Sequence, residues 1–365
     1  MKVALVGPYP ERDAAPVGGV EVATWRLARG LHEAGVDVTV VAIRGAGDDD
    51  GVRDVRVVRL GVDDRWSAMR DLRPLRDALA TVLDSIAPDL VHAEDLVPAG
   101  YAAARVALMG RPTVVTAHGN RRQDTMAAYR GAGAQLRWLL GRRMALRATE
   151  LADVVVGVHP DPALSVPASP QRFEFIPNIV ENSFFAVERQ SDAHQVLYAG
   201  GPRRIKGGDV LFAAWPAVVE RIPQARLLAP GCAAAVGVLS PDVARTIAAP
   251  PWLSGDRFVD VLAGSSVLAI PSRFELAPTA LAEAWAARVP VVATAVGGVP
   301  TMAQGAARLV AANAPGELAA AIAEALTDAP GNAELVAEGN RRAQMQRAES
   351  VVSAHLRLYE DLHEG

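Results

Sequence analysis

Residues Ala269 to Gly298 read AIPSRFELAPTALAEAWAARVPVVATAVGG, and this stretch decides the fold. The apolar run over 267–270 is short enough for a buried parallel strand, and a turn that carries Glu275 follows it. The spacing of the apolar residues over 279–287 predicts a helix with one buried face. Another apolar run over 290–295 predicts the next strand. Strand, loop, helix and strand in this order form the right-handed unit that builds doubly wound α/β sheets.

The start of the predicted helix is suited to bind a phosphate group. Free amide groups and a partial positive charge at a helix N-terminus attract anions. The candidate donors are the amides of Thr279, Ala280 and Leu281, because Pro278 has no amide hydrogen and fits the first helical position. One turn further on, Glu283 is placed to accept hydrogen bonds from a ribose diol, as acidic residues do in dinucleotide sites.

Two glutamates mark this unit, Glu275 in the turn and Glu283 in the helix. We place Glu275 toward the group that lies beyond the phosphate, which gives the order base and ribose, diphosphate, third group. A nucleotide-sugar has this order. Acidic residues around a helix start also stabilise the helix dipole without binding any ligand, and the spacing leaves both interpretations open.

A second loop with the same chemistry spans 200–208 and reads GGPRRIKGG. It follows a predicted strand and combines glycines with Arg203, Arg204 and Lys206. Glycines allow the backbone to approach a ligand closely, and the cations suit a diphosphate. A solvated turn is the alternative interpretation.

The first half of the chain opens with a strand and a glycine-rich loop. Gly18 and Gly19 directly precede a predicted helix, where they allow a ligand to approach the backbone or form only a flexible turn. The pattern G-x-G-x-x-G is absent here, so dinucleotide binding in the usual manner is not expected.

Polar residues also follow two predicted strands of the first half. His92 and Glu94 end one strand, and His118 and Asn120 follow the strand over 112–117. Open α/β sheets bind ligands at the carboxyl ends of their strands, although a histidine there can equally be a satisfied structural residue. His118 and, on the acceptor side, His92, Glu94 and Asn120 are therefore candidate site residues, and both interpretations stay open for them.

Length and composition predict two domains, over 1–187 and 195–346. The chain has 365 residues, of which 50% are apolar, and this is enough for two cores. The net charge of −4 gives no indication of nucleic-acid binding. The single cysteine, Cys232, excludes an internal disulfide, and no apolar run has the length of a membrane span. We therefore expect a cytoplasmic protein.

Charged segments leave further alternatives open. The most basic one, over 121–150, carries arginines from Arg121 to Arg147 around a leucine and tryptophan stripe. It is either a solvated helix that buries this stripe or a contact for an anionic acceptor or a membrane surface. The aspartates of 48–50 lack the spacing of a metal site, so we expect a solvated loop there and no metal.

Four motifs resemble one known family in their order along the chain: GGVE at 18–21, TAHG at 116–119, RRIKGG at 203–208, and the two glutamates with the spacing E-x7-E. They resemble the retaining glycosyltransferases of family 4. The resemblance implies the GT-B fold, an α/β architecture in which two Rossmann-like, doubly wound parallel-sheet domains face each other across a cleft. It also implies that the last helix, in 347–365, crosses back to the first domain.

The resemblance further implies roles for the residues. Glu275 and His118 are expected to contact the donor sugar, Arg204 and Lys206 to hold the leaving diphosphate, and Gly19 to lie near the cleft. The expected activity is that of a hexosyltransferase of class EC 2.4, which uses a nucleoside-diphosphate sugar, most commonly a UDP-sugar. The acceptor hydroxyl belongs to a small natural product, a saccharide or a lipid. Retention of configuration and the absence of any cofactor or metal are also implied.

The chain departs from the family pattern at a few positions. The family arginine of the cationic loop falls on Gly201, so its role passes to Arg203 or Arg204 or is lost, and Ala277 and Pro278 replace a Phe-Gly pair. These departures leave two alternatives, an inactive nucleotide-sugar-binding protein and an epimerase or phosphorylase on the same scaffold. The acceptor and the oligomeric state stay undetermined.

Overall fold

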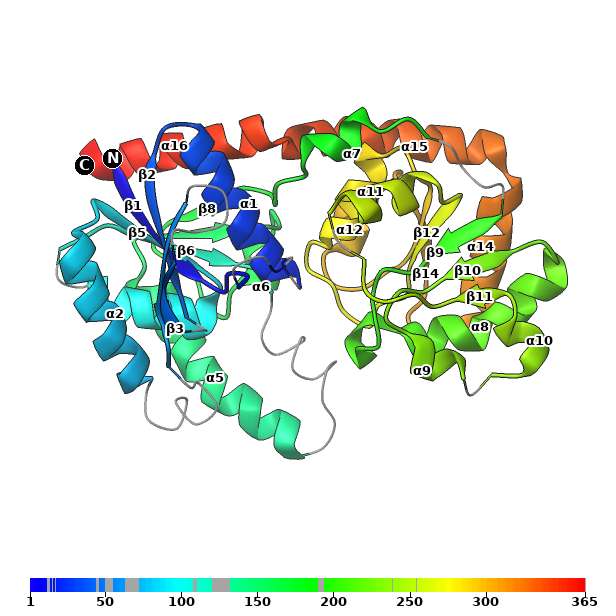
Figure 1. The fold of residues 1–365 in the computed structure, drawn as a ribbon, viewed down its shortest axis with the longest axis horizontal. Coiled ribbons are helices and arrows are strands. Elements are labelled where there is room, and N and C mark those ends of the chain that lie inside the picture. Colours follow the sequence, from blue (N-terminus) through cyan, green and yellow to red (C-terminus); the bar gives the residue numbers. More distant parts are fainter. Residues whose placement is uncertain are drawn as a thin grey trace. The chain divides into compact units, whose positions relative to one another are not determined.

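The computed structural model describes residues 1–11, 14, 16, 18–43, 46–49, 55–62, 72–107, 110–119, 132–189, 194–237, 239–253 and 255–364. The chain divides into two compact units, each built on one sheet (Figure 1). Unit 1 comprises Met1–Ile179 and Ala348–Gly365, and unit 2 comprises Val180–Arg347.

Unit 1 is built on an eight-stranded sheet of order β3-β4-β2-β1-β5-β6-β7-β8. Neighbouring strands are parallel, except that the edge strand β3 runs antiparallel to β4. The strands are β1 (Lys2–Gly7), β2 (Asp37–Ala42), β3 (Ala46–Asp49), β4 (Arg56–Leu60), β5 (Leu90–Glu94), β6 (Thr113–Ala117), β7 (Val154–Gly157) and β8 (Phe173–Phe175).

Helices cover both faces of this sheet, because successive strand residues point to opposite sides. On one face, Val3 and Leu5 of β1 pack under α1 and the C-terminal helix α16. On the other face, Ala4 and Val6 pack under α2, α3 and α5 (Figure 1). The helices are α1 (Gly19–Glu33), α2 (Arg73–Ile86), α3 (Tyr101–Ala107), α5 (Ala132–Leu151), α6 (Pro162–Ser165) and α16 (Ala348–Glu364), with a π turn, η2 (Leu96–Gly100).

Unit 2 is built on a six-stranded sheet of order β11-β10-β9-β12-β13-β14, in which every pair is parallel. The strands are β9 (Gln195–Leu197), β10 (Arg226–Leu228), β11 (Ile247–Ala248), β12 (Val267–Ile270), β13 (Val291–Thr294) and β14 (Arg308–Val310).

The two faces of this sheet bury separate cores. Val196 of β9 packs under α8 and α14, and Leu197 faces α11 and α12. The helices are α7 (Asn182–Ala186), α8 (Gly208–Arg221), α9 (Ala233–Val236), α10 (Pro241–Ala244), α11 (Asp256–Ala263), α12 (Thr279–Ala286), α13 (Val299–Ala303), α14 (Pro315–Thr327) and α15 (Ala329–Ala343), with 3-10 turns η3 (Arg204–Lys206) and η4 (Gln344–Gln346).

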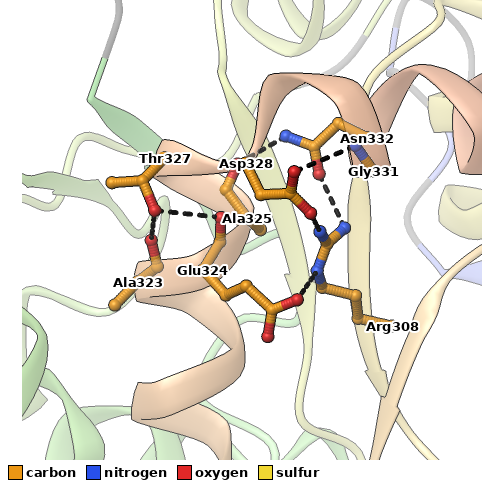
Figure 2. Close-up of polar contacts among 8 residues, drawn as sticks. All are labelled: Arg308, Ala323, Glu324, Ala325, Thr327, Asp328, Gly331 and Asn332. Carbon is orange, nitrogen blue, oxygen red and sulfur yellow. Dashed lines mark hydrogen bonds and ion pairs between the residues drawn. The ribbon is translucent and has the colours of Figure 1, made fainter.

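A polar network joins β14 to the junction of α14 and α15 (Figure 2). The Arg308 guanidinium lies 2.6 Å from Asp328 Oδ2, 2.7 Å from Asn332 Oδ1 and 3.3 Å from Glu324 Oε1. Asp328 also caps α15 by accepting from the Gly331 amide. Arg308 begins β14, so this network lies at the amino end of that strand, whereas ligands of open α/β sheets bind at the carboxyl ends.

The predicted α/β fold of two doubly wound parallel sheets is confirmed, and two details of the prediction were wrong. Residues 46–49 form the edge strand β3 rather than a loop. Residues 180–187, predicted in the first domain, lie in unit 2, because Val180 donates its amide to the Gln346 carbonyl and Phe184 packs into the core beside α12. Of the helices in the described part of the chain, none is long and apolar enough to cross a membrane.

Candidate active site

The loops after β9 and β12 lie side by side at the point where the strand order of unit 2 reverses. From β9 the order runs outward through β10 and β11, and from β12 it runs the other way through β13 and β14. Such a switch point, at the carboxyl ends of the strands, is where open α/β sheets bind ligands. Consequently the predicted cationic loop and the predicted glutamate loop share one site.

The centre of this site is an ion pair between the two loops. Lys206 Nζ lies 2.7 and 3.0 Å from the two carboxylate oxygens of Glu275. Ser272 donates its hydroxyl to Glu275 Oε1 over 2.6 Å. Glu275 is 8% exposed. Its nearly buried carboxylate is stabilised by the Lys206 ammonium group and the Ser272 hydroxyl, which take the place of water.

Gly207 allows the two loops to approach this closely. Its φ is +68°, and a Cβ added to it would lie 1.9 Å from the carbonyl oxygen of Pro271. Only a glycine fits both the left-handed backbone and this contact.

The start of α12 lies directly after the glutamate loop. Pro278 is its N-cap, and the Leu281 amide donates to the Pro278 carbonyl over 3.1 Å. The prediction that Leu281 offers an amide to a phosphate was therefore wrong, because the first turn already uses this donor. In the described part of the chain, the amides of Thr279 and Ala280 have no acceptor.

Glu283, the predicted ribose ligand, lies in the second turn of α12 and is 5% exposed. Its contact with a ribose stays a prediction.

The structure explains why the family arginine has no counterpart at Gly201. This residue has a φ of +64°, and a Cβ added to it would lie 3.2 Å from the Trp252 indole. Trp252 occupies the space that a side chain would need. Arg203 is exposed, and its side chain makes no hydrogen bond or ion pair with any described residue, whereas the carbonyl of Arg204 accepts from Arg273.

Unit 1 also has a switch point, between β1 and β5. After β1, Gly18 with a φ of +102° is the N-cap of α1, and Gly19 begins that helix. His118 follows β6, and its Nε2 donates to Oε2 of Glu94, the last residue of β5. Thus the structure places the predicted His118 and Glu94 in direct contact.

His92 does not belong to the acceptor side, and this prediction was wrong. Its side chain is 0% exposed and is held between two elements. The Tyr359 hydroxyl of α16 donates to Nδ1, and Nε2 donates to Thr116 Oγ1 over 2.7 Å. Thr116 in turn donates to Glu94 Oε1 over 3.4 Å. His92 is therefore a neutral structural residue.

Glu94 was also predicted on the acceptor side. It is 2% exposed, and its carboxylate accepts from His118 and Thr116. Glu94 also lines the pocket beside His118, so its place on the acceptor side stays a prediction.

The pKa values follow from these contacts. Burial lowers the pKa of His92 to about 3, and it also lowers the pKa of His355. Burial opposes ionisation of Glu94, but the charge and hydrogen bond of His118 outweigh it and lower the pKa of Glu94 to about 2. For His118, burial favours the neutral form, yet the charge and hydrogen bond of Glu94 raise its pKa above the usual value. The pair is consequently a carboxylate and an imidazolium.

A pocket of unit 1 opens beside this pair. Its polar lining consists of Glu94, Thr116, His118, Asn178 and His355. The remaining lining is mainly apolar and comes from α1, β7, the segment 176–179 and α16. The pocket is small, about 20 Å³, so it has room for about one water-sized polar group next to the imidazolium.

Sequence reasoning missed Ser272, Asp209, His355 and Tyr359, which support the site residues. Sequence proximity could have indicated two of them: Ser272, three residues before Glu275, and Asp209, three residues after Lys206. Asn120 and 121–131 lie outside the described residues. The last part of the basic segment belongs to α5, where Arg142, Arg143 and Arg147 are exposed. Among the described residues, no group of histidine, cysteine or acidic side chains could hold a metal ion.

Comparisons with known proteins agree with this geometry. The sequence model of Glycosyltransferase Family 4 matches residues 17–183, and that of Glycosyl transferases group 1 matches residues 193–328. Together these matches span most of the chain, one in each unit. No curated protein matches the chain at the sequence level.

Solved structures with the GT-B fold are similar along the whole chain. Sucrose-phosphate synthase from Thermosynechococcus elongatus has a TM-score of 0.81 at 20% identity, with 99% of this chain and 98% of that chain covered. HepE from Anabaena in complex with UDP-glucose has 0.77 at 15%, with 99% and 100% covered. WaaG, a glycosyltransferase involved in lipopolysaccharide biosynthesis, has 0.75 at 17%, with 100% of both chains covered. At these identities the likeness shows the fold, and the predicted GT-B fold is confirmed.

Proposed function

We propose that this chain, a family 4-like glycosyltransferase by the sequence matches of both units, transfers a sugar from a nucleoside-diphosphate sugar to an acceptor hydroxyl. A UDP-sugar is the donor that we favour. The solved HepE structures contain UDP, UDP with glucose, or UDP-glucose, and they have the same fold as this chain.

The observation that carries the proposal is the Lys206–Glu275 pair at the switch point of unit 2. Lys206 contacts the glutamate loop that leads into α12, and in the described part of the chain the amides of Thr279 and Ala280 at the start of this helix have no acceptor, which favours an anion there. This arrangement suits a diphosphate. We assign Glu283 to the ribose. We assign Arg204, which belongs to the cationic loop, to the diphosphate.

In the reaction that we propose, the bond between the anomeric carbon and the β-phosphate oxygen breaks, and the acceptor oxygen forms the new bond on the same face of the sugar. The departing diphosphate gains negative charge, which Lys206 and the helix amides stabilise. A phosphate oxygen takes the acceptor proton, so no protein base is required. Glu275 orients the sugar. The configuration is retained, and the cations make a metal unnecessary.

In unit 1, His118 is a hydrogen-bond donor rather than a base. Its Nε2 is used by Glu94, and the charge and hydrogen bond of that carboxylate raise the pKa of the ring, which favours the protonated form. A protonated imidazole cannot accept the acceptor proton. We assign its Nδ1–H to a hydroxyl of the substrate, which the neighbouring pocket can receive.

The first test is a binding panel of UDP, GDP, ADP, TDP and NAD without added metal, read by thermal shift. A ligand that binds only the native state raises the Tm. We expect a shift with one nucleoside diphosphate, lost in Glu283→Ala and kept in Glu220→Ala, an exposed residue at the far end of α8. A shift with NAD alone contradicts the proposal.

The second test is an acceptor screen with the donor that the panel selects. The anomeric proton signal of the product in NMR distinguishes retention from inversion. Donor binding by the wild type that persists in Glu275→Gln, with no product formed by the wild type from any acceptor, supports the inactive binding protein. A new nucleotide-sugar isomer formed without acceptor supports an epimerase.

A further inference from the structure

Arg273 lies in the glutamate loop, and three of its groups bond to the cationic loop or to the helix that follows it. Its amide donates to the Ile205 carbonyl over 2.8 Å, and its Nη1 donates to the Arg204 carbonyl over 2.7 Å. Nη1 and Nη2 also lie 2.7 Å from Oδ1 and Oδ2 of Asp209, respectively. Arg273 therefore bonds to residues on both sides of Lys206 in the sequence, Ile205 before it and Asp209 after it.

The positive charge of Arg273 is paired with the carboxylate of Asp209. The two side chains form a two-pronged contact, which has the geometry that arginine and carboxylate prefer. Hydrogen bonding to Arg273, together with its charge, lowers the pKa of Asp209 despite some burial, so the aspartate stays ionised. The Arg273 side chain is only 13% exposed. An arginine held in this way has few donors left for a ligand.

Lys206 lies between the residues that Arg273 contacts. It ends the 3-10 turn η3, and among the described residues its ammonium group is hydrogen-bonded to Glu275 alone. At Gly201 the chain has no second cation, because the Trp252 indole fills that space. The affinity for a diphosphate therefore depends strongly on the position of Lys206. In a site with a second cation at position 201, this dependence would be weaker.

Resting on the proposed function, we infer that Arg273 and Asp209 are positioning residues that clamp the loop of Lys206 against the loop of Glu275, and that Arg273 does not itself bind the diphosphate. Without the clamp, the carbonyl of Arg204 and the backbone around Lys206 lose their partner on the neighbouring loop. The lysine then samples several positions, and a diphosphate must order it on binding, which weakens the affinity.

The test is a calorimetric titration with the nucleoside diphosphate that the panel selects, at a temperature well below the Tm of every variant. We compare the wild type with Arg273→Gln, Arg273→Lys, Asp209→Asn and the double variant Arg273→Gln/Asp209→Asn. A clamp predicts that each single variant raises the Kd by about tenfold and that the double variant is no weaker than Arg273→Gln, because both changes break one unit.

Two of these variants separate a clamp from a direct ligand. If Arg273 bound the diphosphate, Asp209→Asn would free its charge and lower the Kd, and Arg273→Lys would keep most of the affinity. A clamp predicts the opposite for both, because lysine cannot contact the carboxylate and the carbonyl in the same geometry. A lower Kd in Asp209→Asn therefore overturns the inference.

Arg308 provides a matched control in the same unit (Figure 2). It is 11% exposed and pairs with Asp328, but it lies at the amino end of its strand. We expect Arg308→Gln to lower the Tm and to leave the Kd unchanged. In turnover, Arg273→Gln should raise the KM of the donor and leave the KM of the acceptor unchanged.

The outcomes separate a failure of the proposed function from a failure of the inferred role of Arg273. If the wild type binds none of the nucleoside diphosphates, the proposed function fails, and this inference fails with it. If the wild type binds one of them and the Arg273 variants bind it equally well, only the inference fails. Equal weakening in Arg273→Gln and Arg308→Gln would also overturn it, because a general loss of rigidity would then be the cause.

Discussion

Lys206 and Glu275 form an ion pair between two loops: the lysine Nζ lies 2.7 and 3.0 Å from the two carboxylate oxygens, and the two residues are 69 positions apart in the sequence. A diphosphate that binds to Lys206 must share it with this carboxylate. The pair therefore sets the lysine in place and competes with the ligand.

Glu275→Gln tests this competition. The substitution removes a negative charge next to the diphosphate and releases Lys206, so we expect UDP to bind about fivefold more tightly. Turnover should fall by about 10²-fold, because the side chain that orients the sugar is changed. Calorimetry with UDP and an initial-rate assay measure the two effects. Glu220→Gln, on the far end of α8, serves as the control. Weaker UDP binding in Glu275→Gln would show that the carboxylate does not compete.

Gly207→Ala tests the close contact of the two loops. The new Cβ would lie 1.9 Å from the Pro271 carbonyl oxygen, so the loops must separate. We expect a loss of about 3 kcal/mol or more in the free energy of unfolding, measured with urea.

The matched control for this change is Gly305→Ala. Gly305 has a φ of +72°, but no atom lies within 4 Å of the added Cβ. Its cost should be the backbone strain alone, about 1 kcal/mol. Equal costs at the two positions would contradict the proposed contact.

Glu94→Gln tests the protonation of His118. Burial lowers the pKa of His118, and the charge and hydrogen bond of Glu94 more than compensate for it. Removing the charge should bring the pKa down, so that His118 loses its proton at a lower pH. An NMR titration of the histidine ring protons measures this shift without a substrate. Glu33→Gln, an exposed residue of α1, should leave the titration unchanged. The alkaline limb of kcat/KM should move to lower pH in parallel.

The buried histidines predict sensitivity to acid. The pKa of His92 is lowered by burial to about 3, and that of His355 is lowered by burial as well. A group with a lowered pKa stabilises the fold fully above its unfolded pKa of about 6.5 and loses this contribution as the pH falls through its folded pKa. Between pH 6 and 4 we therefore expect the unfolded state to bind more protons and the Tm to fall.

His355→Leu should reduce this dependence on pH. Each neutral buried histidine adds a slope of about 1.4 kcal/mol per pH unit to the unfolding free energy in this range. Removing His355 should lower the proton uptake on unfolding, as measured from the Tm between pH 4 and 6. An unchanged slope would show that His355 is already protonated in the fold.

Local patterns were sufficient for the elements of unit 2. The apolar runs at 267–270 and 291–294 are strands, and the helix between them begins at Thr279. These predictions succeeded because strand and helix periods are properties of short segments. The predicted loop at 46–49 failed for the same reason: β3 exists only because β4 offers it a partner, which no local pattern contains.

The candidate site also shows which features follow from local sequence and which from tertiary structure. The sequence alone determined that glycines, cations and glutamates follow particular strands, and hence that Lys206, Glu275 and His118 lie at the carboxyl edges of two parallel sheets. Only the tertiary structure decided which of them meet. Arg273 was not predicted to pair with Asp209, and His92 was expected near the acceptor until Tyr359, 267 residues away, proved to bury it. The physical reason is that strand order and helix packing, rather than spacing along the chain, bring such side chains within hydrogen-bonding distance.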